Sequence, residues 1–487
     1  MKILFVASEA VPFCKTGGLA DVAGALPRIL HERGHDVRLA LPRYGDIDNN
    51  RFRLLPLMPE MKVRYGERTL AGSILRCSYP KSQMPVYFVD EPSLFGRKGL
   101  YGNSHGDFPD NDVRFAFFNM ATLWLLKGLD WQPDVIHVND WQTGLIPALL
   151  KNHPEIIGDS FYQEIRTVFM LHNLSYQGNF DRYIVPSIGL PWSVFTQDGA
   201  EFYDKFSFLK SGIVYSDKLV AVSPTYSREI QTKEYGAGME GALQQRANDL
   251  VGILNGIDVS EWNPETDAMI AKQFTAGSPA GKRACREELV KIGNLDKDSA
   301  HPLIGITSRL VDAKGFDLVE KAIDDLLALD AQFFILGTGD QKHEQLLKET
   351  AAKHPGRMHV HIGFDVPLSH KVIAGSDLFL MPSRFEPCGL TQMYSMKYGT
   401  IPIVRKTGGL SDTVFPATRA SIEAGHGTGF LFEEYAADAM VAACREAITL
   451  FKQHPKAWSA LMQNAMQQNF SWQRSAEEFE ELYRSLE

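Results

Sequence analysis

The 487-residue chain has no closely spaced cysteines, no long apolar run and no dense basic cluster. Its five cysteines are scattered, so the sequence predicts neither a disulfide framework nor a cysteine-rich metal site. No apolar run approaches the roughly 20 residues that a membrane-spanning helix needs. The net charge is −9, whereas nucleic-acid binding depends on clustered lysine and arginine. We therefore expect a protein that binds neither nucleic acid nor a membrane.

Two nucleotide-binding signatures are also missing. The sequence has no G-x-x-x-x-G-K-[ST] motif, and no G-x-G-x-x-G motif follows its first predicted strand. These absences exclude the usual P-loop and dinucleotide-dependent dehydrogenase sites. The opening MKILFVASEA lacks a basic segment followed by a separate apolar stretch and a cleavage site. We therefore expect a cytoplasmic protein.

Hydrophobic residues make up 44% of the chain and charged residues 22%, which is typical of a globular protein of two or three domains. Short apolar strands alternate with helical patterns, which predicts α/β domains with parallel sheets. The first unit has a strand at 2–7, a helix at 19–33 and a strand at 36–41. Pro27 is expected to kink or break that helix.

A second set of strands begins after GILNGID (252–258), at 302–307, 332–336, 358–362, 378–381 and 401–404. Helices are expected between them, including 316–329 and 342–353. This pattern predicts two Rossmann-like domains, 1–251 and 252–464, that face each other across a deep cleft at the C-terminal ends of their strands. The helical stretch 465–487 is expected to cross back onto the first domain.

Two similar loops, KTGGLAD (15–21) and KTGGLSD (406–412), each follow a predicted strand and precede a predicted helix. Paired glycines let backbone N–H groups approach a phosphate, and a helix N-terminus and a lysine add positive charge. For one such loop, a tight turn with an exposed lysine is an equally good interpretation. Two loops in equivalent positions favour a shared anionic ligand.

Several charged side chains also follow predicted strands. Arg309 and Lys314 suit a diphosphate leaving group, although ordinary surface charge is the alternative. Glu386 lies in a Pro-flanked loop, and Gly389 is expected to open a helix whose N–H groups face a phosphate. Asp140 and His172 follow two further strands, and their alternatives are an N-cap and a core histidine. The D-x-D motifs at 46–48 and 110–112 follow no convincing buried strand, so we expect no metal.

In their order along nearly the whole chain, these motifs resemble those of the bacterial glycogen synthases and plant starch synthases. That family consists of retaining GT-B glucosyltransferases that use ADP-glucose. The resemblance implies a glycogen-synthesising enzyme that binds ADP-glucose or ADP and a glycogen or malto-oligosaccharide acceptor, without a cofactor. The motifs that carry it are KTGGLADV (15–22), HVNDWQTG (137–144), HNLSYQG (172–178), FLKSGIVYSD (208–217), VSPTYSREI (222–230), ILNGID (253–258), SRLVDAKGFDL (308–318), LGTGD (336–340), PSRFEPCGLTQMYSMKYG (382–399) and TGGLSDTV (407–414).

The resemblance also implies roles for single residues. Domain 1–251 would bind the acceptor glucan and domain 252–464 the ADP-glucose. Arg309 and Lys314 would bind the diphosphate, Glu386 the donor glucose, and the main-chain carbonyl of His172 would face the anomeric carbon. The other residues implied in binding are Asp140 on the acceptor side, Asn255 at the donor sugar, Phe364 near the adenine, and Lys15, Gly18, Asp21, Cys388, Gly389, Leu390, Thr391, Thr407, Gly408 and Gly409 around the phosphates and sugar.

The sequence departs from related patterns at two positions. Tyr394 stands where many retaining GT-B enzymes have a second glutamate, which the glycogen and starch synthases also lack. Ala313 replaces a glutamine common in the family, beside the retained Lys314. No carboxylate is clearly placed as a nucleophile, so we expect front-face transfer. A pyridoxal-phosphate-dependent glucan phosphorylase and a non-catalytic glucan-binding protein are the rival interpretations.

Overall fold

A computed structural model describes residues 1–103, 105–297 and 300–486. The described chain forms two compact units. Unit 1 is Met1–Asn255 together with the chain from Trp472 onward, and unit 2 is Gly256–Ser471. Within these described ranges, no helix combines the length and the apolar character that crossing a membrane requires.

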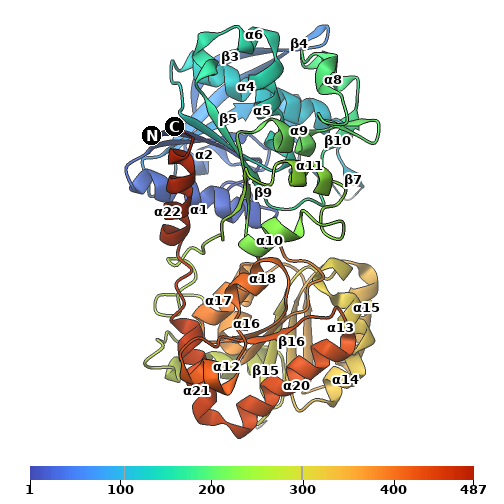
Figure 1. The fold of residues 1–487 in the computed structure, drawn as a ribbon. Helices are drawn as coiled ribbons and strands as arrows, with labels where there is room; N and C mark the ends of the chain where they lie inside the picture. The colour runs from blue at the N-terminus through green and yellow to red at the C-terminus, as the bar shows by residue number, and fades with distance from the viewer. Residues whose placement is uncertain (104, 298–299, 487) are drawn as a thin grey trace. The chain divides into compact units, whose positions relative to one another are not determined.

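Among the described residues, unit 1 is built on a nine-stranded sheet (Figure 1). β1 lies between β2 and β8 and is parallel to both. The strand order reverses direction at this point, which makes the carboxyl ends of β1 and β8 a topological switch point, the usual ligand site of such sheets. In spatial order the strands are β14 (Leu250–Gly252), β13 (Lys218–Ala221), β9 (Arg166–Leu171), β8 (Val135–Asn139), β1 (Lys2–Val6), β2 (Asp36–Pro42), β5 (Pro85–Asp90), β4 (Arg68–Ser78) and β3 (Leu55–Tyr65).

One edge of this otherwise parallel sheet is antiparallel, a feature that the sequence analysis did not predict. β3 and β4 form a hairpin, and β4 also runs antiparallel to β5. The hairpin turn has Gly66 at φ 58°, a conformation that favours glycine. Much of β3 is exposed, so its residues lack the continuous apolar run that marks a buried parallel strand. The small sheet of β10 (Asn179–Asp181), β12 (Lys205–Ser207) and β11 (Glu201–Phe202) was also missed.

Pro27 was expected to kink or break helix α1 (Gly18–Glu32), but the helix continues through Pro27, so it is not broken there. Pro27 is buried together with Leu26 and Leu30 on the face that packs into unit 1. Proline inside a helix costs about 3 kcal/mol or more, but burial of an apolar face supplies most of the stability of a helix in a folded protein. Here tertiary burial outweighs the local penalty.

In the described part of unit 2, six strands form one parallel sheet in the order 3-2-1-4-5-6 by position in the unit. β15 has β16 on one side and β18 on the other, so the switch point of this sheet lies between β15 and β18. The loops after these two strands are therefore brought together. The strands are β17 (Met358–Ile362), β16 (Gln332–Gly337), β15 (Leu303–Thr307), β18 (Leu378–Met381), β19 (Ile401–Arg405) and β20 (Phe430–Phe432).

Helices cover both faces of the unit 2 sheet (Figure 1). The helix expected at 316–329 is instead two short helices, because the backbone departs from helical geometry at Ala322 with φ −105° and ψ 9°. No glycine or proline marks this break in the sequence. The main helices are α12 (Ala280–Ile292), α13 (Phe316–Lys321), α14 (Ile323–Ala328), α15 (Gln341–Lys353), α16 (Val366–Gly375), α17 (Thr391–Lys397), α18 (Gly408–Thr413), α20 (Ala437–Gln453) and α21 (Pro455–Met466).

The final helix, α22 (Trp472–Arg484), belongs to unit 1 and packs beside α1 (Figure 1). The Glu480 carboxylate accepts hydrogen bonds from Arg33 Nε at 2.7 Å and Nη2 at 3.1 Å, and His35 Nε2 lies 3.1 Å from it. The Tyr483 hydroxyl lies 2.6 Å from His137 Nδ1 in the core. These polar contacts set the position of α22 on an otherwise apolar surface.

Candidate functional site

A partly buried ion pair lies at the switch point of unit 2. Lys314 ends the short 3-10 helix η3 (Asp312–Lys314) after β15, and Glu386 lies in the loop after β18. Lys314 Nζ donates to Glu386 Oε2 at 2.6 Å, and Ser383 Oγ donates to the same oxygen at 2.9 Å. No residue that the structure describes donates to Glu386 Oε1. The carboxylate is thus held by one oxygen while the other remains an available acceptor.

A glycine allows the two loops to come this close. Gly315 follows Lys314 with φ 83°, and a Cβ atom there would lie 2.1 Å from the main-chain oxygen of Pro382. Real Cβ atoms do not approach a carbonyl oxygen so closely, so a side chain at 315 would push the β15 and β18 loops apart. The glycine next to Lys314 therefore helps to set the distance between Lys314 and Glu386.

The second K-T-G-G-L loop packs against the main chain of Glu386. The amide of Gly409 donates to the main-chain oxygen of Glu386 at 3.1 Å. Gly408 has φ 45°, and a Cβ atom there would lie 2.0 Å from that same oxygen. Thr407, just before them, is fully buried. The structure thus brings Thr407–Gly409 against the backbone that carries the Glu386 side chain.

The chain after Glu386 turns into α17. The helix begins at Thr391 with Leu390 as its N-cap, two residues later than the predicted start at Gly389, because Gly389 adopts φ 69° outside the helical region. The Gly389 and Leu390 amides have no acceptor within the described ranges. Cys388 is buried, and its carbonyl accepts a hydrogen bond from Gln392 Nε2 at 3.2 Å. Free N–H groups beside Glu386 suit an anionic oxygen.

Arg309 and Phe364 lie at the same carboxyl edge of the sheet without touching the ion pair. Arg309 follows β15 and is exposed, and its guanidinium has no hydrogen-bond or ion-pair partner in the described part of the chain. Phe364 follows β17 and is 84% exposed. Neither the exposed ring of Phe364 nor the unpaired guanidinium of Arg309 contributes to the packing of the described part of unit 2. Both groups are suited to contact a bound ligand.

In unit 1, the loop after β1 contains a carboxyl group that the sequence analysis missed. Glu9 is buried, and it accepts hydrogen bonds from the Thr16 amide and from Thr16 Oγ1 at 2.9 Å. Burial raises the pKa of Glu9 to about 7. The hydrogen bonds from Thr16 lower this pKa, but their effect is smaller than that of burial. Its signal in the sequence is a single acidic residue within the apolar run FVASEAV, directly after a strand.

Asp140 lies at the other side of the same switch point, directly after β8. Its backbone has φ 52° and ψ −174°, an uncommon conformation for a residue other than glycine, and one that often marks functional sites. Its Oδ1 accepts a hydrogen bond from the His172 amide at 2.8 Å, so the carboxylate is not a side-chain helix cap. Burial raises the pKa of Asp140 to about 7, and the nearby charge of Glu9 contributes to the same direction.

His172 is neutral in this environment, because burial lowers its pKa to about 3. Its Nε2 lies 2.9 Å from Asn139 Oδ1, which sets the ring orientation. Asn255 is buried, and its Oδ1 has no hydrogen-bond partner among the residues described. Buried polar atoms are normally paired, so this oxygen is available to a ligand or a water molecule.

The first K-T-G-G-L loop joins β1 to α1. Lys15 Nζ is bound to Asp21 Oδ1 at 2.7 Å across the loop, and the lysine side chain remains 44% exposed. Gly18 is the first residue of α1. The structure thus places Lys15, Gly18 and Asp21 together with Glu9 at the carboxyl edge of the unit 1 sheet.

The acidic groups considered for metal binding have other partners. Asp48 caps α2 (Asn49–Phe52) by accepting from the Asn50 amide at 2.8 Å, and Asp110 binds Arg97 Nη1 at 2.9 Å. The ligand atoms of Asp312, Asp340 and His343 lie within 4.8 Å of one another. However, Asp312 Oδ1 already contacts Lys342 Nζ at 3.0 Å and His343 Nε2 at 2.8 Å.

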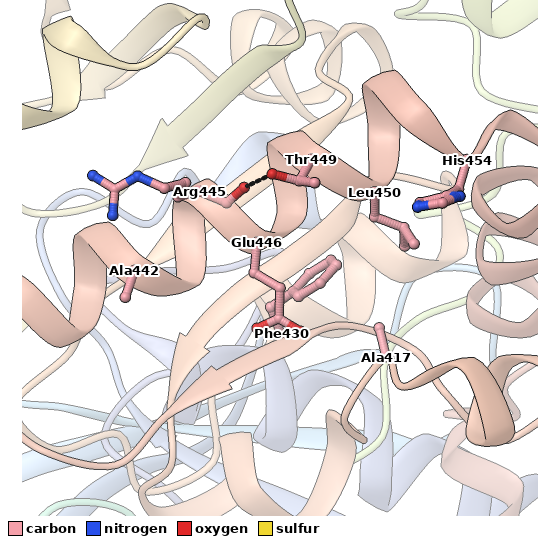
Figure 2. Close-up of a pocket in the computed structure, with 8 residues that line it drawn as sticks. All are labelled: Ala417, Phe430, Ala442, Arg445, Glu446, Thr449, Leu450 and His454. Carbon is pink, nitrogen blue, oxygen red and sulfur yellow. Dashed lines mark hydrogen bonds between the residues drawn. The ribbon is translucent and has the colours of Figure 1, made fainter.

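A separate hollow of about 450 Å³ lies on unit 2 along α20 (Figure 2). The side chains around it are mainly apolar or small, and Figure 2 shows the Thr449 hydroxyl bonded back to the Arg445 carbonyl of its own helix, at 2.7 Å. This hollow contains none of the residues that the sequence predicted as a site. It is lined by Ala417, Phe430, Ala442, Arg445, Glu446, Thr449, Leu450 and His454.

Comparison with known proteins links both units to one group of enzymes. Residues 2–245 match the family model described as starch synthase catalytic domain, and residues 288–485 match the one described as glycosyl transferases group 1. A glycogen synthase of Anaeromyxobacter sp. (strain Fw109-5) is 48% identical over 487 residues, which cover 100% of this chain and 99% of the relative. A glycogen synthase of Desulforudis audaxviator (strain MP104C) is 45% identical over 497 residues, which cover 99% and 96%.

Two solved structures share the fold. The catalytic domain of Starch Synthase IV from Arabidopsis thaliana, bound to ADP and acarbose, matches with a TM-score of 0.91 and 33% identity. The match covers 100% of this chain and 99% of that one. Sucrose-phosphate synthase from Thermosynechococcus elongatus matches with a TM-score of 0.60 at 16% identity, covering 100% and 98%, which supports the fold alone.

Proposed function

Because this chain belongs to the glycogen and starch synthase family of GT-B glycosyltransferases, we propose that it uses ADP-glucose as donor. Glucose would pass to the 4-hydroxyl at the end of an α-1,4-glucan, with retention at the anomeric carbon and release of ADP. The proposal extends to a cytoplasmic enzyme that needs no cofactor. Its starch synthase relative was solved with ADP and acarbose, a pairing of nucleotide and sugar-like ligand that supports these substrate classes.

The observation that carries this proposal is the geometry of Lys314 and Glu386. Lys314 and Ser383 occupy one carboxylate oxygen of Glu386, and a donor-sugar hydroxyl would donate to the other. The lysine then stands beside the sugar, where it can contact the diphosphate. A carboxylate that already accepts a cationic and a neutral hydrogen bond is a better sugar acceptor than a nucleophile.

The departing diphosphate gains negative charge as the bond to the anomeric carbon breaks. Arg309, Lys314 and the amides of residues 389–391 would stabilise that charge, as preorganised donors do in other enzymes. We propose a front-face reaction, in which the leaving phosphate oxygen takes the proton of the attacking 4-hydroxyl. The C4 oxygen forms the new bond to the anomeric carbon, and the old bond to the β-phosphate oxygen breaks.

Unit 1 would supply the acceptor side of the reaction. Asp140 would accept a hydrogen bond from a glucan hydroxyl, and Glu9 lies close enough to influence its charge. The main-chain carbonyl of His172 would face the anomeric carbon, and the neutral ring adds no positive charge that would compete for the phosphate. The remaining donor contacts would come from Asn255, Phe364, Cys388, Lys15, Gly18, Asp21, Thr407, Gly408 and Gly409.

The test incubates the protein with glycogen and labelled ADP-glucose, and in parallel with labelled UDP-glucose. We expect incorporation from ADP-glucose, and Glu386→Ala and Lys314→Ala should each lower turnover by about 10²–10³-fold. The matched control is the Lys371–Glu288 pair of unit 2, whose Nζ–Oε1 distance is 2.7 Å. Lys371→Ala and Glu288→Ala should keep full turnover.

Three results would contradict the proposal. Absence of transfer from either donor would reject the activity, and preferential transfer from UDP-glucose would reject the donor. A glucosyl adduct on Glu386, trapped with a slow donor and found by mass spectrometry, would replace the front-face reaction with a covalent one.

A further inference from the structure

Tyr435 lies at the carboxyl edge of the unit 2 sheet, between β20 and α20. It is half-buried, and it belongs to none of the motifs discussed above. Its hydroxyl donates to Asp317 Oδ1 and lies 3.2 Å from the main-chain oxygen of Asp312. These two acceptors stand on either side of Lys314 in the sequence. The hydroxyl therefore anchors Asp317 on one side of the lysine and lies close to the Asp312 carbonyl on the other side.

The same aspartate connects this segment to the loop that carries Glu386. Asp317 Oδ2 accepts a hydrogen bond from Arg384 Nη2 at 2.9 Å. The Arg384 amide donates to the Ala313 carbonyl at 3.0 Å. Ala313 directly precedes Lys314, and Arg384 precedes Glu386 by two residues. Asp317 thus accepts from Tyr435 with one oxygen and from the Glu386 loop with the other.

The ring of Tyr435 is held by two arginines. The Arg384 guanidinium carbon lies 4.6 Å from the ring centroid, and that of Arg405 lies 5.3 Å from it. Arg405 Nη1 also donates to the Arg384 carbonyl, and its Nε donates to the Glu433 carbonyl at 3.3 Å. Loops that follow β15, β18 and β20, and Arg405 at the end of β19, therefore meet at one phenol.

We propose that Tyr435 is a positioning residue, which holds Lys314 at the distance from Glu386 that glucosyl transfer requires. A lysine side chain is flexible and loses much rotamer entropy when it is fixed, so its position depends on where its backbone is anchored. A misplacement of about 1 Å costs on the order of 10²-fold in rate. The catalytic consequence rests on the proposed function, whereas the anchoring of residues 312–317 does not.

The substitution Tyr435→Phe removes the hydroxyl and keeps the ring between the two arginines. The Asp312 side chain remains bound to Lys342 and His343, so the loop should stay folded. With ADP-glucose and glycogen we expect kcat to fall about tenfold, the KM for glycogen to change less than twofold and the melting temperature to stay within about 2 °C. The matched control is Tyr162→Phe, which removes a buried phenol donating to the Leu123 carbonyl at 3.0 Å in unit 1.

Two further measurements separate positioning from a general structural effect. In a Lys314→Ala background, Tyr435→Phe should cost no additional activity, because the side chain it positions is gone. An equal loss in both backgrounds would overturn the proposal, as would full activity of Tyr435→Phe. Asp317→Asn, which weakens the acceptor of the Tyr435 hydroxyl, is the second variant and should act in the same direction.

Hydrogen exchange tests the anchoring without any turnover. Amides in a peptide covering residues 308–318 should exchange faster in Tyr435→Phe than in the unsubstituted protein, and Tyr162→Phe should leave them unchanged. Unchanged exchange in Tyr435→Phe would overturn the proposal. If the unsubstituted protein transferred glucose from neither donor, the proposed function would fail, and this exchange experiment would still decide whether Tyr435 anchors the loop.

Discussion

Asp140 and Glu9 are two buried carboxyl groups at the same switch point of unit 1, and burial raises the pKa of each to about 7. Below about pH 7 they are largely neutral, and above it they ionise. An ionised carboxylate accepts a hydrogen bond from a sugar hydroxyl more strongly than a neutral one does. If this pair binds the acceptor, acceptor binding depends on pH in the neutral range.

The prediction at this scale concerns Asp140→Asn. In the unsubstituted protein the KM for glycogen should fall as the pH rises from 6 to 8, while the KM for ADP-glucose stays constant. Asp140→Asn should raise the KM for glycogen about tenfold at pH 8 and less at pH 6, since a charged hydrogen bond contributes roughly 1.5–3 kcal/mol. Initial rates across this range check it, with Asp134→Asn as control, because Asp134 is exposed and directly precedes the same strand. A profile shared by both variants would remove Asp140 from the acceptor site.

Glycines decide how closely the loops of unit 2 approach one another. Gly408 and Gly425 both have positive φ, of 45° and 79°. They differ in space, because a Cβ at 408 would lie 2.0 Å from the Glu386 carbonyl, whereas the nearest atom to a Cβ at 425 is Asn464 Oδ1 at 4.0 Å. Substituting Gly408 and Gly425 in turn therefore separates the effect of an unfavourable backbone conformation from the effect of a steric clash.

The prediction for this element is that Gly408→Ala displaces the Glu386 backbone. We expect turnover to fall about 10²-fold, in line with a displacement of roughly 1 Å at a catalytic group. Gly425→Ala should destabilise the fold by about 1 kcal/mol without lowering kcat. Urea unfolding and steady-state kinetics measure the two effects. Equal kcat values for the two variants would show that the close approach of α18 does not position Glu386.

At the scale of the whole molecule, the chain ends by returning to unit 1. Glu480 on α22 makes the main polar contacts between this helix and the rest of unit 1, with Arg33 and His35. The hydrogen bonds that Glu480 accepts from Arg33 lower the pKa of Glu480 to about 2. The hydrogen bond with His35 and the positive charge of Arg33 act in the same direction. A carboxyl group whose pKa is lowered in the folded protein stabilises it when ionised. That stabilisation is present above the ordinary pKa near 4.5 and is lost as the pH falls toward 2.

The prediction for the docking of α22 is therefore a pH-dependent loss of stability in Glu480→Gln. At pH 7 the free energy of unfolding should fall by about 2 kcal/mol, and the difference from the unsubstituted protein should shrink between pH 5 and pH 3. Urea unfolding followed by circular dichroism measures it. Glu477→Gln is the control, because Glu477 lies on the same helix, 3.7 Å from Arg33, with its side chain 63% exposed. A constant difference across the pH range would exclude ionised Glu480 as the anchor.

The sequence alone predicted β15, β16, β17, β18 and β19 of unit 2 closely, including the bounds of β17 and β18, but it missed the edge strand β20. Apart from β17, which is only partly buried, these strands are buried and mainly apolar, so local composition marks them. It missed the β3–β4 hairpin, whose residues are largely exposed or half-buried. The break that it allowed at Pro27 does not occur, because burial outweighs the local penalty. Tyr394, whose identity was a departure from related enzymes, stacks on Trp262 with ring centroids 4.0 Å apart, a contact that no local pattern indicates.

What the sequence determined by itself was the chemistry available at each strand end, because strands, glycine turns and charged loops are encoded over a few neighbouring residues. The tertiary structure decided which of those loops meet. Lys314 and Glu386 are 72 residues apart and touch because β15 and β18 are neighbours in the sheet. Glu9 lies near Asp140 because β1 and β8 are also neighbours. Tyr435 follows β20, two strands beyond β18 in the sheet, and reaches Asp317 through the loops at the same carboxyl edge. Strand order is set by the burial of whole layers, which no short stretch of sequence contains.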